Sequence, residues 1–496
     1  MTTHETDFRL LRVEVTNEEG PYVDADLSTD TETGSWTTLI TGRNGAGKSR
    51  LLSAIASSFE TLDGRKLRPR ASVAISYRLA GRECAFRVDG GKISAFLDGR
   101  PVEHDLLPRP TTVVAATASA FDKFNLPRET RVFGASPHSP DGGRYKYLGL
   151  RDSRGRVSSR AGIVRALEQL FDANSDDRSR RQRVADVFSY LGYAPAVEVT
   201  YAWTFRAREI ARKDGEVTSK DIAQFLDKQR RPGNPGARLS IPNYVFEDER
   251  VVEEITAAIE TLRRPGEHRE VVLMADFADA SPGDDDLLRM ARQLTRAGLV
   301  QMSEVTLRRA TTNHRVEITD ASSGELSLVV TLLGIASSIE SGSLVLIDEP
   351  EISLHPQWQS EYLERLSDAF AAYRGCHFVV ATHSPTLVSG ARPERTSIVD
   401  LEDSGIVDRK PTFAGSVDEV LVTTFGVVSK SNLYLRDLLV TALRGAEDGN
   451  LAETIHDGTM EALERARGDL PEADSAGQLI DQLVRIRAEL VGKVRQ

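Results

Sequence analysis

The stretch "WTTLITGRNGAGKSRLLSAIASSF", Trp36 to Phe59, decides the fold. It begins with a β-rich run, passes through a glycine-rich loop, and ends in a segment whose apolar residues recur at helical spacing. Residues Gly42–Ser49 fit the pattern GxxxxGK[ST], which is the phosphate-binding loop (P-loop) when it stands between a strand and a helix. The stretch therefore predicts an α/β protein that binds a nucleotide.

The chemistry of phosphate binding accounts for this composition. Glycines let backbone N–H groups turn inward toward phosphate oxygens, beside a helix N-terminus that favours negative charge. Lys48 is expected to reach the β- and γ-phosphates, and the Ser49 hydroxyl is expected to bind Mg²⁺. The predicted nucleotide-binding residues are Gly42, Asn44, Gly45, Ala46, Gly47, Lys48, Ser49 and Arg50.

A second stretch, "LVLIDE" from Leu344 to Glu349, reads as a buried strand of a parallel sheet that ends in two carboxylates. Burying ionised carboxylates is costly unless a cation compensates, so the pair should lie at the carboxyl end of the sheet, where ligands bind. Asp348 is then expected to complete the Mg²⁺ shell with Ser49. Glu349, projecting to the other side of the extended chain, is expected to polarise an attacking water as general base. The alternative is a strand that runs out into a charged loop.

Composition sets the context for these motifs. The 496 residues, 40% hydrophobic and 28% charged, suit a globular protein of two to four domains. No stretch approaches the ~20 apolar residues of a membrane span, and "MTTHETDFRL" lacks a signal-peptide core. The two cysteines, Cys84 and Cys376, offer neither a disulfide framework nor a zinc site. We expect a cytoplasmic protein with no membrane contact.

The net charge of −11 disfavours indiscriminate coating of nucleic acid. One window departs from it, because Arg144 to Arg183 holds eleven Arg or Lys against five Asp or Glu. The window is either a solvated helix face or mobile loop, or a patch that contacts the phosphates of DNA or RNA.

Two further stretches narrow the class. "ASSGELSLVVTLLGIASSIESG" reads as a small-residue turn followed by an apolar helix from about Leu326 to Ile339, and "CHFVVATHSPTLV" reads as a buried strand ending at His383. The order of P-loop, Ser-Ser-Gly-Glu turn, Asp-Glu strand and terminal His resembles the ABC-type ATPases. Within them it resembles the SMC/RecF/OLD-like branch, where DEPE…LHP and THSP are habitual. The resemblance covers about 1–120 and 316–400.

This resemblance implies ATP and Mg²⁺ as cofactors, held between two paired heads. Ser322, Ser323 and Gly324 would form the signature turn that contacts the γ-phosphate of a second subunit. His383 would be the switch histidine, acting with Glu349 and Lys48 in catalysis, and the loop with Leu354-His355 would sense the partner head. Taken as purely structural features, His383 could instead be a core histidine, the Ser-Ser-Gly-Glu turn a helix cap, and His355 a structural residue.

The sequence departs from the ABC pattern in two places. The strand in "TTVVAATASAFDKFNLP" lacks the Gln that usually contacts Mg²⁺ and the attacking water, and Thr117, Ser119 or Asp122 could substitute for it. The signature turn starts with Ala321 and ends with Glu325, where transporters favour Leu and Gln. The difference in the signature turn favours the chromosome-maintenance and defence branch over transport.

The chain is expected to divide into an ATPase head of 1–140 and 316–412, a mixed, mainly helical insertion of 141–315, and a helical C-terminal region of 413–496. The last helix has an apolar stripe that is either core or partner surface: Leu479, Leu483, Ile486, Leu490 and Val494. Asp400, Glu402 and Asp403 do not form a Toprim nuclease arrangement, so no nuclease site is expected in this chain.

"TASAFDKFNLP", "YKYLGLRD" and "NLYLRDLL" resemble segments of the Septu and retron-associated PtuA-type ATPases of anti-phage defence. That resemblance implies a homo-oligomeric ATPase that controls a separate nuclease. The main alternative is a RecF- or SMC-like ATPase that binds DNA ends for repair, and a transporter's nucleotide-binding subunit is a third, less favoured alternative.

Overall fold

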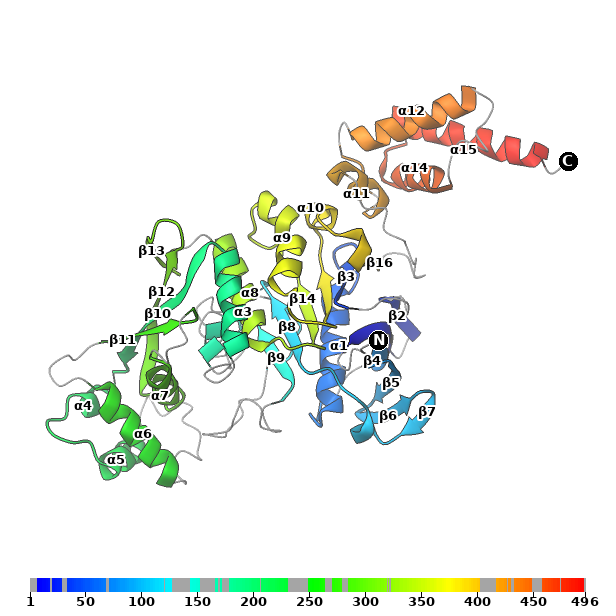
Figure 1. Ribbon diagram of the computed structural model, residues 1–496. Coiled ribbons are helices and arrows are strands. Elements are labelled where there is room, and N and C mark those ends of the chain that lie inside the picture. The colour runs from blue at the N-terminus through cyan, green and yellow to red at the C-terminus, as the bar shows by residue number, and fades with distance from the viewer. Residues whose placement is uncertain are drawn as a thin grey trace.

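The computed structural model forms an α/β head, an insertion and a C-terminal group of helices (Figure 1). The α/β fold class expected from the sequence is confirmed. The structure describes residues 7–17, 20–28, 34–67, 71–119, 121–126, 143–151, 166–167, 170–171, 178–205, 207–230, 249–263, 270–278, 284–318, 320, 323–401, 416–425, 427–429, 432–447, 457–472 and 474–494.

A six-stranded parallel sheet forms the centre of the head, in the order β16-β3-β15-β14-β8-β9. Asp348, at the end of β14, is in register with Thr117 of β8 on one side and Ala381 of β15 on the other. Every residue of these three strands is buried, which explains their uninterrupted apolar runs. The strand bounds are β3 Trp36–Thr41, β8 Val113–Thr117, β9 Tyr145–Leu148, β14 Leu344–Asp348, β15 His377–Ala381 and β16 Thr396–Asp400.

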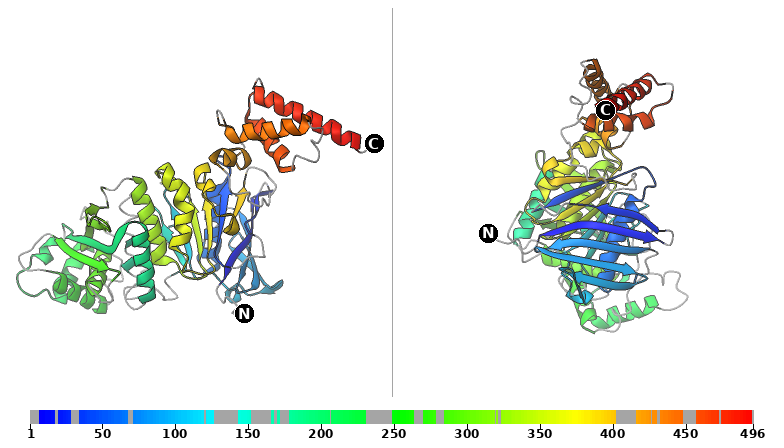
Figure 2. Two further views of the ribbon diagram at one scale, coloured as in Figure 1. Left: turned by 45° about the horizontal axis from the view of Figure 1, so that its top comes forward. Right: turned by 90° about the vertical axis from the view of Figure 1, so that its right-hand side faces the viewer.

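An antiparallel sheet in the order β2-β1-β4-β5-β6-β7 forms a second layer (Figure 2). Helix α1, Lys48–Leu62, lies between the two sheets, and its residues Leu51, Leu52 and Ile55 share one buried cluster with both. The bounds are β1 Phe8–Asn17, β2 Gly20–Asp26, β4 Ser72–Leu79, β5 Arg82–Asp89, β6 Lys92–Leu97 and β7 Arg100–Val102, followed by the short helix η1, His104–Leu106.

The opposite face of the parallel sheet packs against α8, Ser323–Ser338, which begins three residues earlier than the sequence predicted. From Leu332 to Ser338 every residue of this helix is buried, which matches its run of apolar and small side chains. A Cβ on its Gly334 would lie 3.0 Å from the Leu148 side chain, so this glycine permits close contact with β9. The other elements that follow are α9 Pro356–Ala369, α10 Pro385–Ser389 and η4 Pro393–Arg395.

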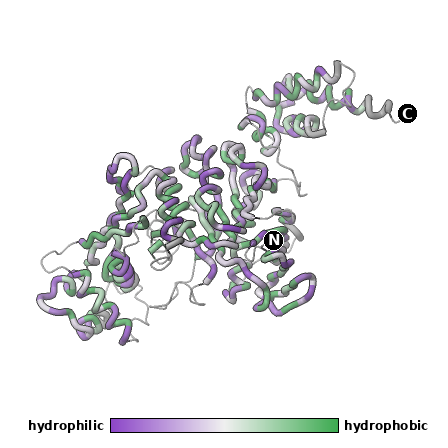
Figure 3. Tube along the Cα trace, viewed as in Figure 1, coloured by the Kyte–Doolittle hydropathy of each residue, from purple (hydrophilic) through white to green (hydrophobic). Residues whose placement is uncertain are grey.

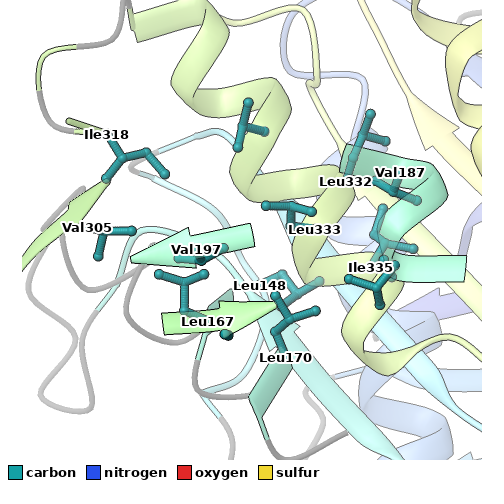
Figure 4. Close-up of a cluster of buried hydrophobic side chains, with 14 of the residues drawn as sticks. Leu148, Leu167, Leu170, Val187, Val197, Val305, Ile318, Leu332, Leu333 and Ile335 are labelled. Carbon is teal, nitrogen blue, oxygen red and sulfur yellow. The ribbon is translucent and has the colours of Figure 1, made fainter. Parts of the chain in front are cut away.

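In its described part, the insertion combines a four-stranded antiparallel sheet, in the order β11-β10-β12-β13, with five helices. Its core is continuous with that of the head, since Val197 of β10 and Val305 of β12 belong to the same buried cluster as Leu332 and Leu333 of α8 (Figure 4). The mixed composition expected for this segment is confirmed. The bounds are α3 Arg178–Tyr190, β10 Tyr193–Trp203, α4 Arg208–Ala211, α5 Ser219–Arg230, α6 Glu249–Leu262, β11 Glu270–Asp276, α7 Asp285–Arg296, β12 Val300–Arg309 and β13 Arg315–Glu317.

The four helices described at the end of the chain combine hydrophilic and hydrophobic residues (Figure 3), and their buried side chains form a separate cluster. Leu483 is buried there and Leu479 packs against it, whereas Ile486 is 40% exposed. The predicted stripe is thus core in its first half, and the side chains of Leu490 and Val494 lie outside the described part. The helices are α11 Val417–Thr423, α12 Leu433–Glu447, α14 Asp457–Asp469 and α15 Ser475–Val494.

Across the described ranges, no helix is both long and apolar enough to cross a bilayer. The division of the chain at residues 140, 315 and 412 stays a prediction.

Candidate nucleotide-binding site

The phosphate loop joins β3 to α1 and turns on three glycines. Gly42, Gly45 and Gly47 have φ angles of 139°, 91° and 105°, which residues with side chains rarely adopt. The Lys48 side chain is buried, and its Nζ donates to the carbonyl oxygens of Gly42 at 2.6 Å and Arg43 at 3.2 Å. The loop thus curves around one ammonium group, at a helix N-terminus suited to anions.

Other loop residues lie nearer solvent. Asn44, Gly45 and Arg50 are exposed, and Ala46 and Ser49 are half-buried. Arg50 lines a groove of about 400 Å³ between α1 and the antiparallel sheet, which Lys48 does not line. The predicted nucleotide-binding residues therefore lie together along the loop, except that Arg50 faces a different surface.

Asp348 lies beside the first turn of α1. The Ser49 hydroxyl donates a hydrogen bond of 3.0 Å to its Oδ1. Asp348 is 2% exposed, and this burial raises its pKa to about 7. The Ser49 hydrogen bond opposes the rise, whereas the negative charges of Glu349, Asp122 and Glu351 add to it.

A divalent cation fits this arrangement. Mg²⁺ commonly takes one or two protein oxygens together with phosphate oxygens and water. A cation beside Asp348 would offset both its burial and the repulsion from neighbouring carboxylates. Within the described residues, no group of three or more His, Cys, Asp and Glu could hold a metal. Ser49 and Asp348, which lie 3.0 Å apart, are the residues that would hold Mg²⁺ together with phosphate oxygens of a nucleotide.

His383, two residues after β15, lies between Lys48 and Glu349. Its Nδ1 is 3.0 Å from Lys48 Nζ, and its Nε2 is 3.2 Å from Glu349 Oε1. Because an ammonium group only donates, Nδ1 accepts, and the ring proton belongs on Nε2, facing Glu349. Burial and then the charge of Lys48 lower the pKa of His383, which favours this neutral form.

The backbone at Glu349 differs from the extended chain that the sequence predicted. Its φ is +50°, the left-handed region, because the chain turns immediately after β14. Glu349 still donates its N–H to the Ala381 carbonyl at 2.9 Å, and its own carbonyl accepts from Ile352 N at 3.2 Å. The expectation of an extended backbone here is wrong, and a tight turn directs the Glu349 side chain toward His383.

Glu351 was not identified from the sequence, although it is the third carboxylate of the Asp-Glu-Pro-Glu run. Its Oε1 accepts a hydrogen bond of 2.5 Å from the backbone N–H of His383. Burial raises the pKa of Glu351, and the hydrogen bond from His383 opposes that rise. Glu351 therefore fixes the loop that carries His383 against the turn after β14.

The signature turn is described only in part, because Ser322 lies outside the described residues and Ser323 is placed as the first residue of α8. A Cβ on Gly324 would lie 2.3 Å from the carbonyl oxygen of Ser353, so only glycine fits there. Glu325 accepts hydrogen bonds from the Tyr193 hydroxyl and Arg309 of the insertion. Residue 325 is therefore a glutamate because its carboxylate binds the insertion.

Three residues could replace the missing Gln. Thr117 is in register with Asp348 and accepts a hydrogen bond from Ser119 N at 3.0 Å. The Ser119 hydroxyl accepts from Phe121 N, and Asp122 is ion-paired to Arg151 at 2.5 Å. Of the three candidates, Thr117 lies beside Asp348 in the sheet. The charge of Asp122 is already compensated by Arg151.

The loop of Leu354 and His355 joins the Asp-Glu turn to α9. Leu354 is buried, whereas His355 is exposed and caps α9 by accepting from Gln357 N at 3.3 Å. A capping role is therefore visible for His355, and its sensing of a partner stays a prediction.

Four arginines of the basic window make contacts within the protein in the part that the structure describes. Each such arginine faces a protein group: Arg144 faces Asp63, Arg151 faces Asp122, Arg181 faces Asp285, and Arg183 lies over the Tyr373 ring. Most of the other arginines of the window lie outside the described residues. The described arginines favour structural roles over phosphate contact.

Together, a glycine loop around Lys48, a Ser49–Asp348 pair and the Glu349–His383 pair define the head of an ABC-type P-loop ATPase. The family model described as "AAA domain, putative AbiEii toxin, Type IV TA system" matches residues 37–389. The chain belongs to this family.

Two curated relatives match short segments. The chain is 40% identical over 67 residues to "Protein ea59" of Escherichia phage lambda, covering 14% of the chain and 13% of that protein. It is 27% identical over 96 residues to "Retron Vc95 probable ATPase" of Vibrio cholerae serotype O1 biovar El Tor, covering 17% of the chain and 18% of that protein. The matches thus span less than a fifth of these relatives.

Solved structures resemble the chain at low sequence identity. An SMC head domain from Thermotoga maritima is 13% identical with a TM-score of 0.35, covering 79% of this chain and 94% of that one. A nucleotide-free ATP-binding cassette from an ABC transporter is 12% identical with a TM-score of 0.27, covering 81% and 89%.

Proposed function

We propose that this chain binds ATP–Mg²⁺ between two paired heads and hydrolyses it. The observation that carries the proposal is the meeting of Ser49 with Asp348, and of Lys48 with His383 and Glu349, at the carboxyl ends of β3, β14 and β15. In this proposal Ser49 and Asp348 hold Mg²⁺, which neutralises charge on the phosphates.

The protein's own residues then have separate duties. Lys48 binds the β- and γ-phosphates in exchange for its contact with Nδ1 of His383, and His383 donates toward the γ-phosphate through its Nε2–H. Glu349 accepts the proton of the attacking water. Ser322, Ser323 and Gly324 of the second head complete the site, so the chain acts as a dimer or a higher homo-oligomer.

We further propose that ATP turnover controls a separate effector, a nuclease, in anti-phage defence. This step is supported by the similarity to a retron ATPase and by a family description that refers to a toxin.

Cells that carry this chain with its neighbouring genes should resist phage, and Glu349→Gln should abolish that resistance. If resistance persists in Glu349→Gln, ATP turnover does not control the effector. If instead no phage is restricted but DNA ends are bound, the chain acts in DNA repair.

A further inference from the structure

Gln359, near the beginning of α9, bridges two loops of the site. Its Nε2 donates a hydrogen bond of 3.1 Å to the Leu354 carbonyl, and its Oε1 accepts one of 2.6 Å from the Ser384 hydroxyl. Leu354 belongs to the turn that follows Glu349, and Ser384 follows His383. One amide group therefore connects the loop of the general base with the loop of the histidine.

The loop of His383 and Ser384 is fixed to Gln359 by a hydrogen bond with a defined direction. The Ser384 hydroxyl also accepts from Leu387 N at 3.1 Å, so its single proton is directed to Gln359. Helices α9 and α10 pack so closely that a Cβ on Gly390 would lie 2.0 Å from the Ser360 carbonyl oxygen. A movement of α9 would therefore move Ser384 with it.

The other side of the bridge leads to the signature turn. Ser353, directly before Leu354, has a φ of +68°, a conformation that costs energy in a residue with a side chain. Its carbonyl oxygen lies against Gly324, where a Cβ would be at 2.3 Å. A displacement of Gly324 would therefore press on Ser353 and Leu354, and through them on Gln359.

We propose that Gln359 is a positioning residue that couples the signature turn of a head to His383 of the same head. The inference rests on the proposed pairing, in which Gly324 faces the nucleotide of the partner head and His383 faces its own. Binding of ATP at one site then adjusts His383 at the other. The two ATP molecules of a pair are hydrolysed cooperatively for this reason.

The test measures the ATP dependence of hydrolysis for Gln359→Met, which keeps the length of the side chain and loses both hydrogen bonds. We expect kcat to fall by about tenfold and the Hill coefficient to fall toward 1, while the Kd for ATP changes by less than about threefold. The matched control is Gln357→Met on the same helix, because the Gln357 amide donates only to Glu361, at 3.2 Å, among the contacts seen. It should behave as wild type.

Gln359→Glu tests the bridge again, because it keeps an acceptor for Ser384 and loses the donor to Leu354. It should show the same loss, and it stands in if Gln359→Met fails to fold. A double-mutant cycle with Ser384→Ala, which removes the hydroxyl that donates to Gln359, should give a combined effect smaller than the product of the single effects. A wild-type Hill coefficient near 1, unchanged kinetics in Gln359→Met and Gln359→Glu, or independent effects in the cycle each overturn the inference. Absence of ATPase activity in the wild type would instead overturn the proposed function.

Discussion

The Ser49 hydroxyl donates a hydrogen bond to Asp348 across 299 residues of sequence. This contact exists because β14, which follows the insertion, pairs in the same sheet with β8, which precedes it, and with β15, the neighbour of β3. The two parts of the head, before and after the insertion, therefore form one sheet. The nucleotide site depends on this pairing of strands, because it takes residues from both parts.

The two carboxylates after β14 should fail differently when each is replaced by its amide. Asp348→Asn weakens the metal site, so both ATP affinity in Mg²⁺ and turnover should fall. Glu349→Gln keeps size and hydrogen bonding but loses the base, so ATP should bind while hydrolysis drops by about 10²-fold or more. Equilibrium ATP binding and steady-state ATPase rates measure the two effects.

In Glu349→Gln, bound ATP should keep the heads paired, which light scattering would report as a doubled mass. Wild-type hydrolysis by this variant would rule out Glu349 as the general base. If ATP never promotes pairing in either variant, the two-headed mechanism is wrong.

Lys48→Ala should abolish ATP binding, because the phosphates lose the ammonium group that the loop encloses. Labelled-ATP binding to the folded variant measures this, with Lys123→Ala as a control from the exposed loop after β8. Near-normal affinity in Lys48→Ala would contradict the role of the loop.

The sequence predicted the parts of the site that are set by local pattern. The P-loop, the buried run that ends at Asp348 and the strand before His383 follow from period, turn residues and motif order. Within the insertion, "AVEVTYAWTF" and "EVVLMADF" became β10 and β11 for the same reason.

Contacts between loops could not be predicted in this way. The left-handed turn at Glu349, the hydrogen bond of Glu351 to His383 and the bridge at Gln359 depend on how β14 and β15 lie beside each other. Likewise, the sequence could not show that Arg181 has an internal partner, because Asp285 lies 104 residues away. Arg181 was therefore grouped with the basic window.

Arg181 should stabilise the insertion. Its side chain is 11% exposed and pairs at 2.7 Å with Asp285, which is 10% exposed. Removing one partner of a buried pair leaves an uncompensated charge, so Arg181→Ala should lower the free energy of unfolding by about 2–4 kcal/mol. Arg289→Ala is the control, because Arg289 pairs with Asp286 at 60% and 75% exposure and should cost less than about 1 kcal/mol. Denaturant titration compares them, and equal losses would argue against a buried pair.

His377 should make the head sensitive to acid. Its ring is fully buried, with Nδ1 accepting from Leu10 N at 2.9 Å and Nε2 beside the Thr38 hydroxyl at 2.8 Å. Burial lowers its pKa well below the usual value, so only the unfolded chain takes up a proton below about pH 6.5. The contribution of His377 to stability should be complete above that pH and should be lost as the pH drops below it.

Thermal unfolding from pH 8 to 5 measures this loss, and His377→Gln should flatten the curve below pH 6.5. The exposed His314→Gln should leave the curve unchanged. A wild-type slope in His377→Gln would assign the acid sensitivity to other groups.

Asp348 should make the chain without nucleotide less stable at high pH. Its folded-state pKa of about 7 lies above the value of about 3.9 expected when unfolded. Between these values the folded state binds the extra proton, so stability falls as the pH rises from about 4 to about 7. Asp348→Asn should remove that fall and be more stable than wild type at pH 8 by about 1–4 kcal/mol.

Mg²⁺ with ATP should stabilise the wild type but not this variant, since the cation compensates the carboxylate. Chemical denaturation at pH 5 and pH 8, with Asp286→Asn as an exposed control, provides the comparison. If Asp348→Asn is the less stable protein at pH 8 without nucleotide, burial does not strain this carboxylate.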